Sequence, residues 1–323
     1  MAAKLIDETA RGVYIIAATP FIDDGTLDLE STERMVDFYL ESGVDGMTIL
    51  GVMGEAPKLA PEESVRFAAR VLTRVGGRIP VIVGASSAGL GLMKSLTDQV
   101  MALGAAGVMV SPMAGLKTED AIETYFAGVV KTLGPAVPIV LQDYPQLTQV
   151  NMSAGLINKL LAQFESIKIL KHEDCPGLRK LTKVRAAEKR GERKRRVSIL
   201  VGNSALYLVQ ELQRGADGAN TGFAFPEMLV EVCSRFFAGD VVGAEDLFDI
   251  YLPLVRYEQQ PGVGLSIRKE ILRRRGVLRS AALRAPGMSL DADDHKELDG
   301  LLARLERTLA AWRTGAARPH AAE

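Results

Sequence analysis

Eight short apolar runs, rich in valine and isoleucine, recur along the chain, and each is followed by a longer amphipathic stretch. A parallel strand that is covered on both faces has such a continuous apolar sequence, and parallel neighbours need a helical crossover between them. Eight strand–helix units predict an α/β fold of the (β/α)8 TIM barrel type. The open-sheet alternative would more often carry a glycine-rich dinucleotide fingerprint after its first strand, and the sequence has none. The runs are 13–19, 46–50, 80–84, 107–111, 137–142, 167–171, 197–202 and 217–222.

Helices are expected between the runs, most clearly at 29–43 and 61–77, where apolar residues recur at helical spacing and glycine marks the end. Three further helical stretches follow the last strand, at about 226–258, 263–276 and 291–315. We expect the first of these to complete the barrel. We divide the chain into the barrel, 1–240, and a C-terminal helical extension, 241–323, packed on the barrel because no Pro-, Gly- or Ser-rich linker separates them.

The composition excludes several classes of protein. The 323 residues carry a net charge of −1, so no overall field attracts nucleic acid or an acidic membrane. No apolar run approaches the ~18–20 residues that span a bilayer, and the N-terminus lacks the apolar region of a secretory signal. With only two cysteines and three scattered histidines, we expect a cytoplasmic protein without disulfides or a metal site. We interpret the basic segment 179–196 as an exposed helix face and end rather than an RNA-binding patch, because no aromatic residues interleave.

Lys171 is the first candidate for catalysis. It ends the sixth apolar run, and catalytic groups of a TIM barrel lie at the carboxyl ends of the strands. Desolvation favours the neutral form of an amine, which attacks carbonyl groups. The alternative is a structural ion pair with Glu173 or Glu55.

Other polar or glycine-rich positions follow the remaining strands, and we expect them to surround Lys171. Glu173 and Tyr144 are candidates for proton transfer. The candidates for substrate binding are Gly51, Val52, Met53, Gly54, Gln142, Gly202, Asn203, Asn220 and Thr221. A capping role on the next helix is the alternative for Asn220 and Thr221. His172 alternates with Lys171 and should point away from the lumen in a structural role.

Several segments closely resemble the dihydrodipicolinate synthase/N-acetylneuraminate lyase family in order and spacing. They are ATPFIDDGTLDLE (18–30), GVDGMTILGVMGEAPKLAPEE (43–63), PVIVGAS (80–86), LGAAGVMVSP (103–112), VPIVLQDYP (137–145), IKILKHE (167–173) and RAP (284–286). The resemblance implies class I aldolase chemistry, in which Lys171 forms a Schiff base with pyruvate or another 2-oxo acid and no cofactor is needed. It places the carboxylate-binding loop at 51–55. It also implies a homo-oligomer, a homotetramer or a dimer, that binds a small-molecule 2-oxo acid.

The sequence departs from the family pattern at positions that carry protons or bind acids. Val52 and Met53 replace the two hydroxyl residues of the carboxylate loop, and Gln142 replaces the catalytic tyrosine. An amide orients groups by hydrogen bonds but is no acid–base at neutral pH. The synthase arginine that grips a second carboxylate falls near Leu147, which is apolar. Tyr144 should share a face with Gln142 and can present a phenol, or it packs beside Pro145.

The pattern Gln-Asp-x-Pro (142–145), followed by Lys-x-Glu (171–173) and GADGANTGFAFPE (215–227), narrows the resemblance to a branch that includes 2-keto-3-deoxy-L-arabonate dehydratase, which also carries the glutamine. Three functions follow. The first is a Schiff-base lyase, an aldolase or dehydratase of a 2-keto-3-deoxy sugar acid. The second is a dihydrodipicolinate synthase that condenses pyruvate with aspartate semialdehyde. The third is a non-catalytic barrel that binds a small acid.

Overall fold

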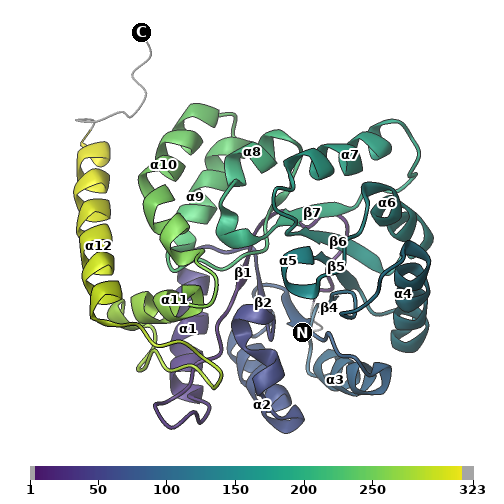
Figure 1. The fold of residues 1–323 in the computed structure, drawn as a ribbon, viewed down its shortest axis with the longest axis horizontal. Coiled ribbons are helices and arrows are strands. Elements are labelled where there is room, and N and C mark those ends of the chain that lie inside the picture. Colours follow the sequence, from purple (N-terminus) through teal and green to yellow (C-terminus); the bar gives the residue numbers. More distant parts are fainter. Residues whose placement is uncertain (1–3, 315–323) are drawn as a thin grey trace.

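Eight parallel strands close into a barrel in which each strand pairs with the next along the chain and the last pairs with the first. The computed structural model describes residues 4–314 and confirms the predicted TIM barrel (Figure 1). Every predicted apolar run overlaps a strand. The strands are β1 (Gly12–Ile16), β2 (Gly46–Ile49), β3 (Val81–Gly84), β4 (Gly107–Val110), β5 (Ile139–Asp143), β6 (Ile167–His172), β7 (Ser198–Val201) and β8 (Gly218–Ala219).

The helices between the strands begin and end where local sequence favours it. The carboxylate of Asp28 accepts the Ser31 N–H at the start of α1, and Pro61 opens α2, which ends at Gly76 with a φ of 59°. Both helices lie within the predicted ranges. The barrel helices are α1 (Leu29–Glu41), α2 (Pro61–Val75), α3 (Leu90–Ala102), α4 (Glu119–Leu133), α5 (Pro145–Thr148), α6 (Ala154–Gln163), α7 (Leu178–Lys189), α8 (Leu208–Gln213) and α9 (Pro226–Phe237), with 3₁₀ turns η1 (Val52–Gly54), η2 (Ala56–Lys58) and η3 (Asn203–Ala205).

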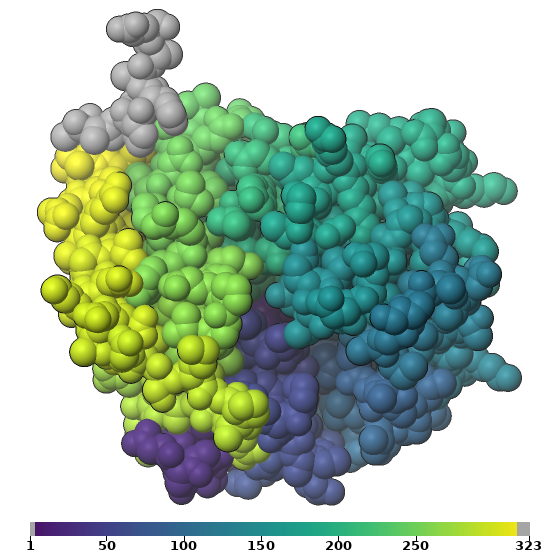
Figure 2. Space-filling model, in the orientation of Figure 1, coloured from purple at the N-terminus to yellow at the C-terminus, as the bar shows by residue number. Residues whose placement is uncertain are grey.

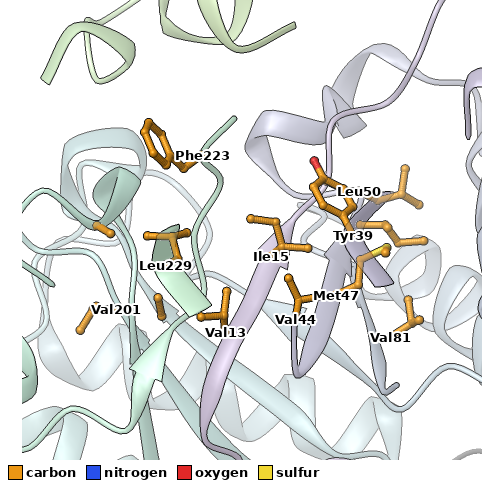
Figure 3. Packing of buried hydrophobic residues seen from close by; sticks show 14 of the residues in the cluster. Val13, Ile15, Tyr39, Val44, Met47, Leu50, Val81, Val201, Phe223 and Leu229 are labelled. Atoms are coloured by element: carbon orange, nitrogen blue, oxygen red, sulfur yellow. The ribbon is translucent and has the colours of Figure 1, made fainter. Parts of the chain in front are cut away.

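Strand residues pack into two separate hydrophobic layers, and β1, β3, β4, β5, β6 and β7 contribute to both of them. Val13, Ile15 and Met47 point outward to the helices, as Figure 3 shows for part of this layer. The second layer fills the lumen and consists of Ile6, Ala10, Tyr14, Ile82, Ala106, Met109, Val140, Ile169 and Leu200. Since Ile169 faces the lumen, Lys171, two residues further on, faces its mouth, and His172 faces the helices.

The C-terminal extension consists of α10 (Val241–Glu258), α11 (Gly264–Arg274) and α12 (Ala292–Arg313), with α12 outermost (Figure 1). The expectation of one helix over 226–258 is wrong, because Gly239 has a φ of 90° and the Asp240 carboxylate caps α10. α10 packs against both α9, the last barrel helix, and α12. A domain boundary at residue 240 stays a prediction, and residues 315–323 of the proposed extension, His320 among them, lie outside the described part of the chain.

The basic segment 179–196 is only partly an exposed helix face. Arg185 and Arg193 are buried and both pair with Glu188, while Arg195 pairs with Glu8. These arginines fasten the end of α7 and the following turn to the amino-terminal end of the barrel. Across residues 4–314, no helix is long and apolar enough to cross a membrane.

Glu55 joins the extension to the loop that follows β2. Its carboxylate is 2% exposed, with Oε1 2.7 Å from Lys269 Nζ and Oε2 3.0 Å from Lys58 Nζ. Oε2 also accepts the Arg284 backbone N–H at 3.0 Å. Burial lowers the pKa of Lys269 to about 8, and the carboxylate of Glu55 opposes this shift. One buried carboxylate thus holds α11 and the segment before α12 against the rim of the barrel.

We expect Glu55→Gln to lower the free energy of unfolding by about 3 kcal/mol, because Lys269 then stays buried without an opposite charge. Urea denaturation measures the change. A second substitution, Lys269→Met, should recover part of the loss. Glu30→Gln removes an exposed ion pair with Arg34 and serves as the control, with an expected loss under about 1 kcal/mol. Equal losses in the two single variants would contradict this role of Glu55.

Candidate active site

A cavity of about 620 Å³ opens at the carboxyl ends of the strands, between the barrel and the extension. Figure 2 shows this face hollowed between the yellow-green extension and the teal middle part of the chain. The predicted site residues that line it are Val52, Met53, Gln142, Tyr144, Lys171, Glu173, Asn203 and Thr221. Gly51, Gly54, Gly202 and Asn220 are chain neighbours of these residues and lie behind the lining. The structure therefore brings together residues from five strand ends.

Lys171 lies at the centre of a buried polar group. Its ammonium Nζ is 2.9 Å from Oε1 of Glu173, and the same Oε1 accepts a hydrogen bond of 2.7 Å from Gln142 Nε2. Lys171 and Gln142 are each 4% exposed and Glu173 is 7% exposed. The ion pair with Glu173, which was the structural alternative for Lys171, therefore exists, and it joins these two candidate catalytic residues. Glu55 pairs elsewhere.

Two residues after β7 hold Glu173 in place. A Cβ atom on Gly202 would lie 2.1 Å from Glu173 Cγ, so only glycine leaves room for this carboxylate side chain. Asn203 Nδ2 donates to the Glu173 backbone oxygen at 2.7 Å. Gly202 and Asn203 were expected to contact substrate. The geometry gives both a direct role in positioning Glu173, and Asn203 also reaches the cavity.

Tyr144 lines the cavity on the same side as Gln142, as the alternation along β5 predicts. Burial raises the pKa of the Tyr144 phenol, and the negative charge of Glu173 raises it further. The phenol therefore keeps its proton at neutral pH and can donate it. Tyr144 borders the cavity, whereas the adjacent Pro145 is buried and not part of the lining.

The loop after β2 presents backbone rather than hydroxyl groups. Val52 is 42% exposed and, with Met53, lines the cavity, and the first N–H groups of the η1 turn have no acceptor within the turn. Thr19 Oγ1 donates to the Gly54 carbonyl at 2.6 Å and fixes the loop. Gly51 has a φ of −81°, so an ordinary residue would also adopt this backbone. Such a turn can bind a carboxylate through backbone N–H groups.

Asn220 and Thr221 follow β8, but they do not cap the next helix. The N-cap of α9 is Phe225, without a side-chain hydrogen bond, so the capping alternative is wrong. Asn220 is fully buried in the lumen, with Oδ1 3.2 Å from Thr48 Oγ1. Thr221 lines the cavity and is the better placed of the two to contact a ligand.

A second buried polar group lies behind β6. His172 is fully buried and directed away from the lumen, as expected, with Nε2 3.1 Å from the Gly177 oxygen. Lys180 Nζ lies 2.7 Å from Asp143 Oδ2. Burial raises the pKa of the nearby Glu211 carboxyl to about 7, and the charge of Glu173 adds to the shift while His172 opposes it. These groups link the ends of β5 and β6 to α7 and α8.

Residues of the extension form the part of the lining that sequence reasoning missed. The segment after α10 and the first turns of α11 close one side of the cavity, with Arg268 buried among them. These lining residues are Glu258, Gln259, Gln260, Pro261, Gly262, Gly264, Leu265 and Arg268. The available signal was weak: Arg268 is one basic residue among several in a helix, beside the apolar Ile267 and Ile271.

Comparison with known proteins agrees with this geometry. Residues 9–305 match the model of the dihydrodipicolinate synthetase family. An L-2-keto-3-deoxyarabonate dehydratase of Azospirillum brasilense is 30% identical over 94% of this chain and 96% of its own. The structure of a dihydrodipicolinate synthase from Rhodopseudomonas palustris is 46% identical, with a TM-score of 0.91 over 94% of this chain and all of its own. YagE of E. coli, solved in complex with pyruvate, is 25% identical, with a TM-score of 0.83 over 92% of this chain and 98% of its own.

The raised pKa of Glu211 makes stability depend on pH. Between pH 4.5 and 7 the folded protein holds a proton that the unfolded chain has lost, so stability falls as the pH rises through this window. Glu211→Gln removes that dependence. Relative to this variant, we expect the native protein to lose about 3 kcal/mol of unfolding free energy from pH 4.5 to 7. Denaturant titrations at both pH values measure it, with the exposed Glu231→Gln as control. A constant difference between native protein and Glu211→Gln would contradict the shift.

Proposed function

The chain belongs to the dihydrodipicolinate synthetase family and is a lyase of the class I aldolase type, and from this we propose that it acts on a 2-keto-3-deoxy sugar acid through a Schiff base on Lys171. The observation that carries the proposal is the 2.9 Å contact of the Lys171 amine with Glu173 inside a cavity of substrate size. The N–H groups around Val52 and Met53 would bind the substrate carboxylate.

Formation of the Schiff base needs a proton acceptor beside the amine, and Glu173 Oε1 is placed for it. Lys171 gives one proton to Glu173 and adds to the C2 carbonyl carbon. The former carbonyl oxygen then takes one proton from the amine and one from Glu173 and leaves as water. The product is an iminium, which draws electrons from C3. Gln142 cannot transfer a proton, and its hydrogen bond keeps Oε1 of Glu173 directed at Lys171.

The iminium makes loss of a C3 proton feasible. Glu173, which has given its proton to the departing water, accepts the C3 proton, and an enamine is left. The enamine then expels the C4 hydroxyl, which departs as water after receiving a proton. Tyr144 is the proposed donor, because it lines the cavity and a phenol is protonated at neutral pH, and the proton held by Glu173 then restores it. Water then hydrolyses the unsaturated iminium and frees Lys171. Cleavage of the C3–C4 bond from the same iminium would instead give pyruvate and an aldehyde.

The charges in the cavity favour a substrate with a single carboxylate. Its lining contains two cations, Lys171 and Arg268, and each has a carboxylate beside it. Leu147 lies where the synthase family arginine is expected, and it is apolar. Aspartate semialdehyde would bring a second carboxylate into the cavity. Both cations of the lining are already paired with a carboxylate, so neither is available to bind it. Hydroxyl groups, in contrast, would find donors and acceptors in Asn203 and Thr221.

Dihydrodipicolinate synthesis remains the second candidate, since the Rhodopseudomonas palustris structure carries the name of that enzyme. The name of the Azospirillum relative supports dehydration of a sugar acid. The third candidate, a barrel that only binds acids, fits poorly with a buried amine beside a proton acceptor. Assembly into a dimer or tetramer and a cytoplasmic location stay predictions.

Trapping with borohydride tests the Schiff base directly. The protein is incubated with pyruvate or 2-keto-3-deoxy-L-arabonate, reduced and weighed, and we expect one adduct per chain at Lys171. Lys171→Ala should give none. Lys168→Ala, on the same strand but paired with Glu8, should give the same adduct as the native protein. Absence of an adduct with every 2-oxo acid would reject both enzyme functions, and turnover of pyruvate with aspartate semialdehyde alone would favour the synthase.

Two substitutions separate the roles of the proton carriers. Glu173→Gln should lower kcat for the sugar acid by about 10²- to 10⁴-fold, because the amide cannot accept the Lys171 proton. Tyr144→Phe should lower kcat by a similar factor and leave trapping of pyruvate intact. Tyr125→Phe, whose phenol bonds the Ser111 oxygen away from the cavity lining, is the control. Unchanged turnover in Tyr144→Phe would remove Tyr144 from the mechanism.

A further inference from the structure

Arg268, on α11 of the extension, is a buried cation that borders the cavity. It is 1% exposed, and its Nε donates to Oε1 of Glu258, which is fully enclosed by protein. The other carboxylate oxygen of Glu258 accepts the Ala224 N–H at 3.2 Å. The pair is therefore neutral as a whole and fixed to the segment after β8.

The barrel makes room for this guanidinium. A Cβ atom on Gly222 would lie 2.0 Å from Arg268 Nη1, so glycine at this position lets the side chain reach the cavity wall. On the other side, Arg268 Nη2 lies 3.2 Å from Ser204 Oγ. Ser204 is in the left-handed region with a φ of 51°, and so are its neighbours Asn203 and Ala205. Strained backbone of this kind persists where its surroundings hold it, and it occurs often at functional sites.

Two of the three guanidinium nitrogens of Arg268, Nε and Nη2, have hydrogen-bond partners, and Nη1 has no hydrogen-bond acceptor among residues 4–314. The neighbouring buried cation shows what a structural role looks like. Lys269 Nζ is 2.7 Å from Glu55 and 2.8 Å from the Ala282 oxygen, and it does not line the cavity. Of two adjacent buried pairs, the one that borders the cavity keeps a donor without a partner. A buried donor is costly to leave unpaired, so an acceptor from the ligand fits the observation.

We propose that Arg268, neutralised by Glu258, forms the subsite for the far end of the substrate, where Nη1 donates to the oxygen of an uncharged hydroxyl group. This inference rests on the proposed function. It specifies the substrate further, as a 2-oxo acid with a hydroxylated tail beyond the carbons that react. Glu258 sets the preference for a hydroxyl over a second carboxylate, since it already balances the guanidinium charge. Ser204 and Thr221 supply hydroxyl groups beside the same wall. The extension thereby acts in specificity as well as in packing.

Arg268→Lys tests the proposal, because lysine keeps the charge opposite Glu258 and lacks Nη1. We expect kcat/KM for 2-keto-3-deoxy-L-arabonate to fall about 10- to 100-fold, mainly through KM, while borohydride trapping of pyruvate, which has no tail, stays unchanged. Arg273→Lys is the matched control on the same helix, where the arginine is half exposed and pairs with Glu270. It should leave both measurements unchanged. A double variant, Arg268→Met with Glu258→Met, removes the pair without stranding a charge and should reproduce the loss if Arg268→Lys unfolds.

Each outcome decides one point. If native protein and Arg268→Lys turn over the sugar acid equally and melt at the same temperature, the proposed subsite is wrong. The Schiff-base function is then unaffected. If Arg268→Lys loses pyruvate trapping together with turnover of the sugar acid, the role of Arg268 is structural only, and the proposed subsite is again wrong. Failure of the native protein to form any adduct contradicts the proposed function, and trapping of pyruvate without turnover of the sugar acid contradicts the hydroxylated tail.

Discussion

The ion pair between Lys171 and Glu173 lies at the end of β6, where little water reaches either group. A charge in such a place needs an opposite charge beside it, because burial of a lone ion costs several kcal/mol. The same requirement shapes the rest of the barrel mouth. Glu258 neutralises Arg268, and Glu55 neutralises Lys269. The Glu55–Lys269 pair joins the barrel to the extension. Glu258 and Arg268 both lie in the extension, and they reach the barrel through the Ala224 N–H and Ser204. The groups that balance charge therefore also hold the cavity wall together.

The three pairs differ in what they leave available. Glu55 and Lys269 satisfy each other and their backbone neighbours, and they stabilise the rim. Lys171 and Glu173 can exchange a proton, which makes their pairing a resting state for chemistry rather than only a structural contact. Arg268 has one buried nitrogen, Nη1, that has no hydrogen-bond acceptor among residues 4–314. Small residues make these arrangements possible, since Gly202 admits Glu173 and Gly222 admits Arg268.

The loss of the family tyrosine has a consistent physical explanation in this arrangement. Gln142 donates to the oxygen that faces Lys171, so the amide orients the carboxylate, and the proposed mechanism assigns proton transfer to Glu173. Tyr144, two residues later, borders the cavity on the same side as Gln142. Burial and the charge of Glu173 raise the pKa of its phenol, which therefore holds its proton in the resting protein.

The sequence by itself determined the barrel, because eight apolar runs of strand length leave few other ways to bury them, and strand ends share one rim. For the same reason it located Lys171, Glu173 and Gln142, which occupy those ends. Only the tertiary structure decided that Arg268 borders the cavity and that Gly202 makes room for Glu173. These depend on contacts between residues far apart in the chain, and on packing of α11 against the rim, which local periodicity does not encode.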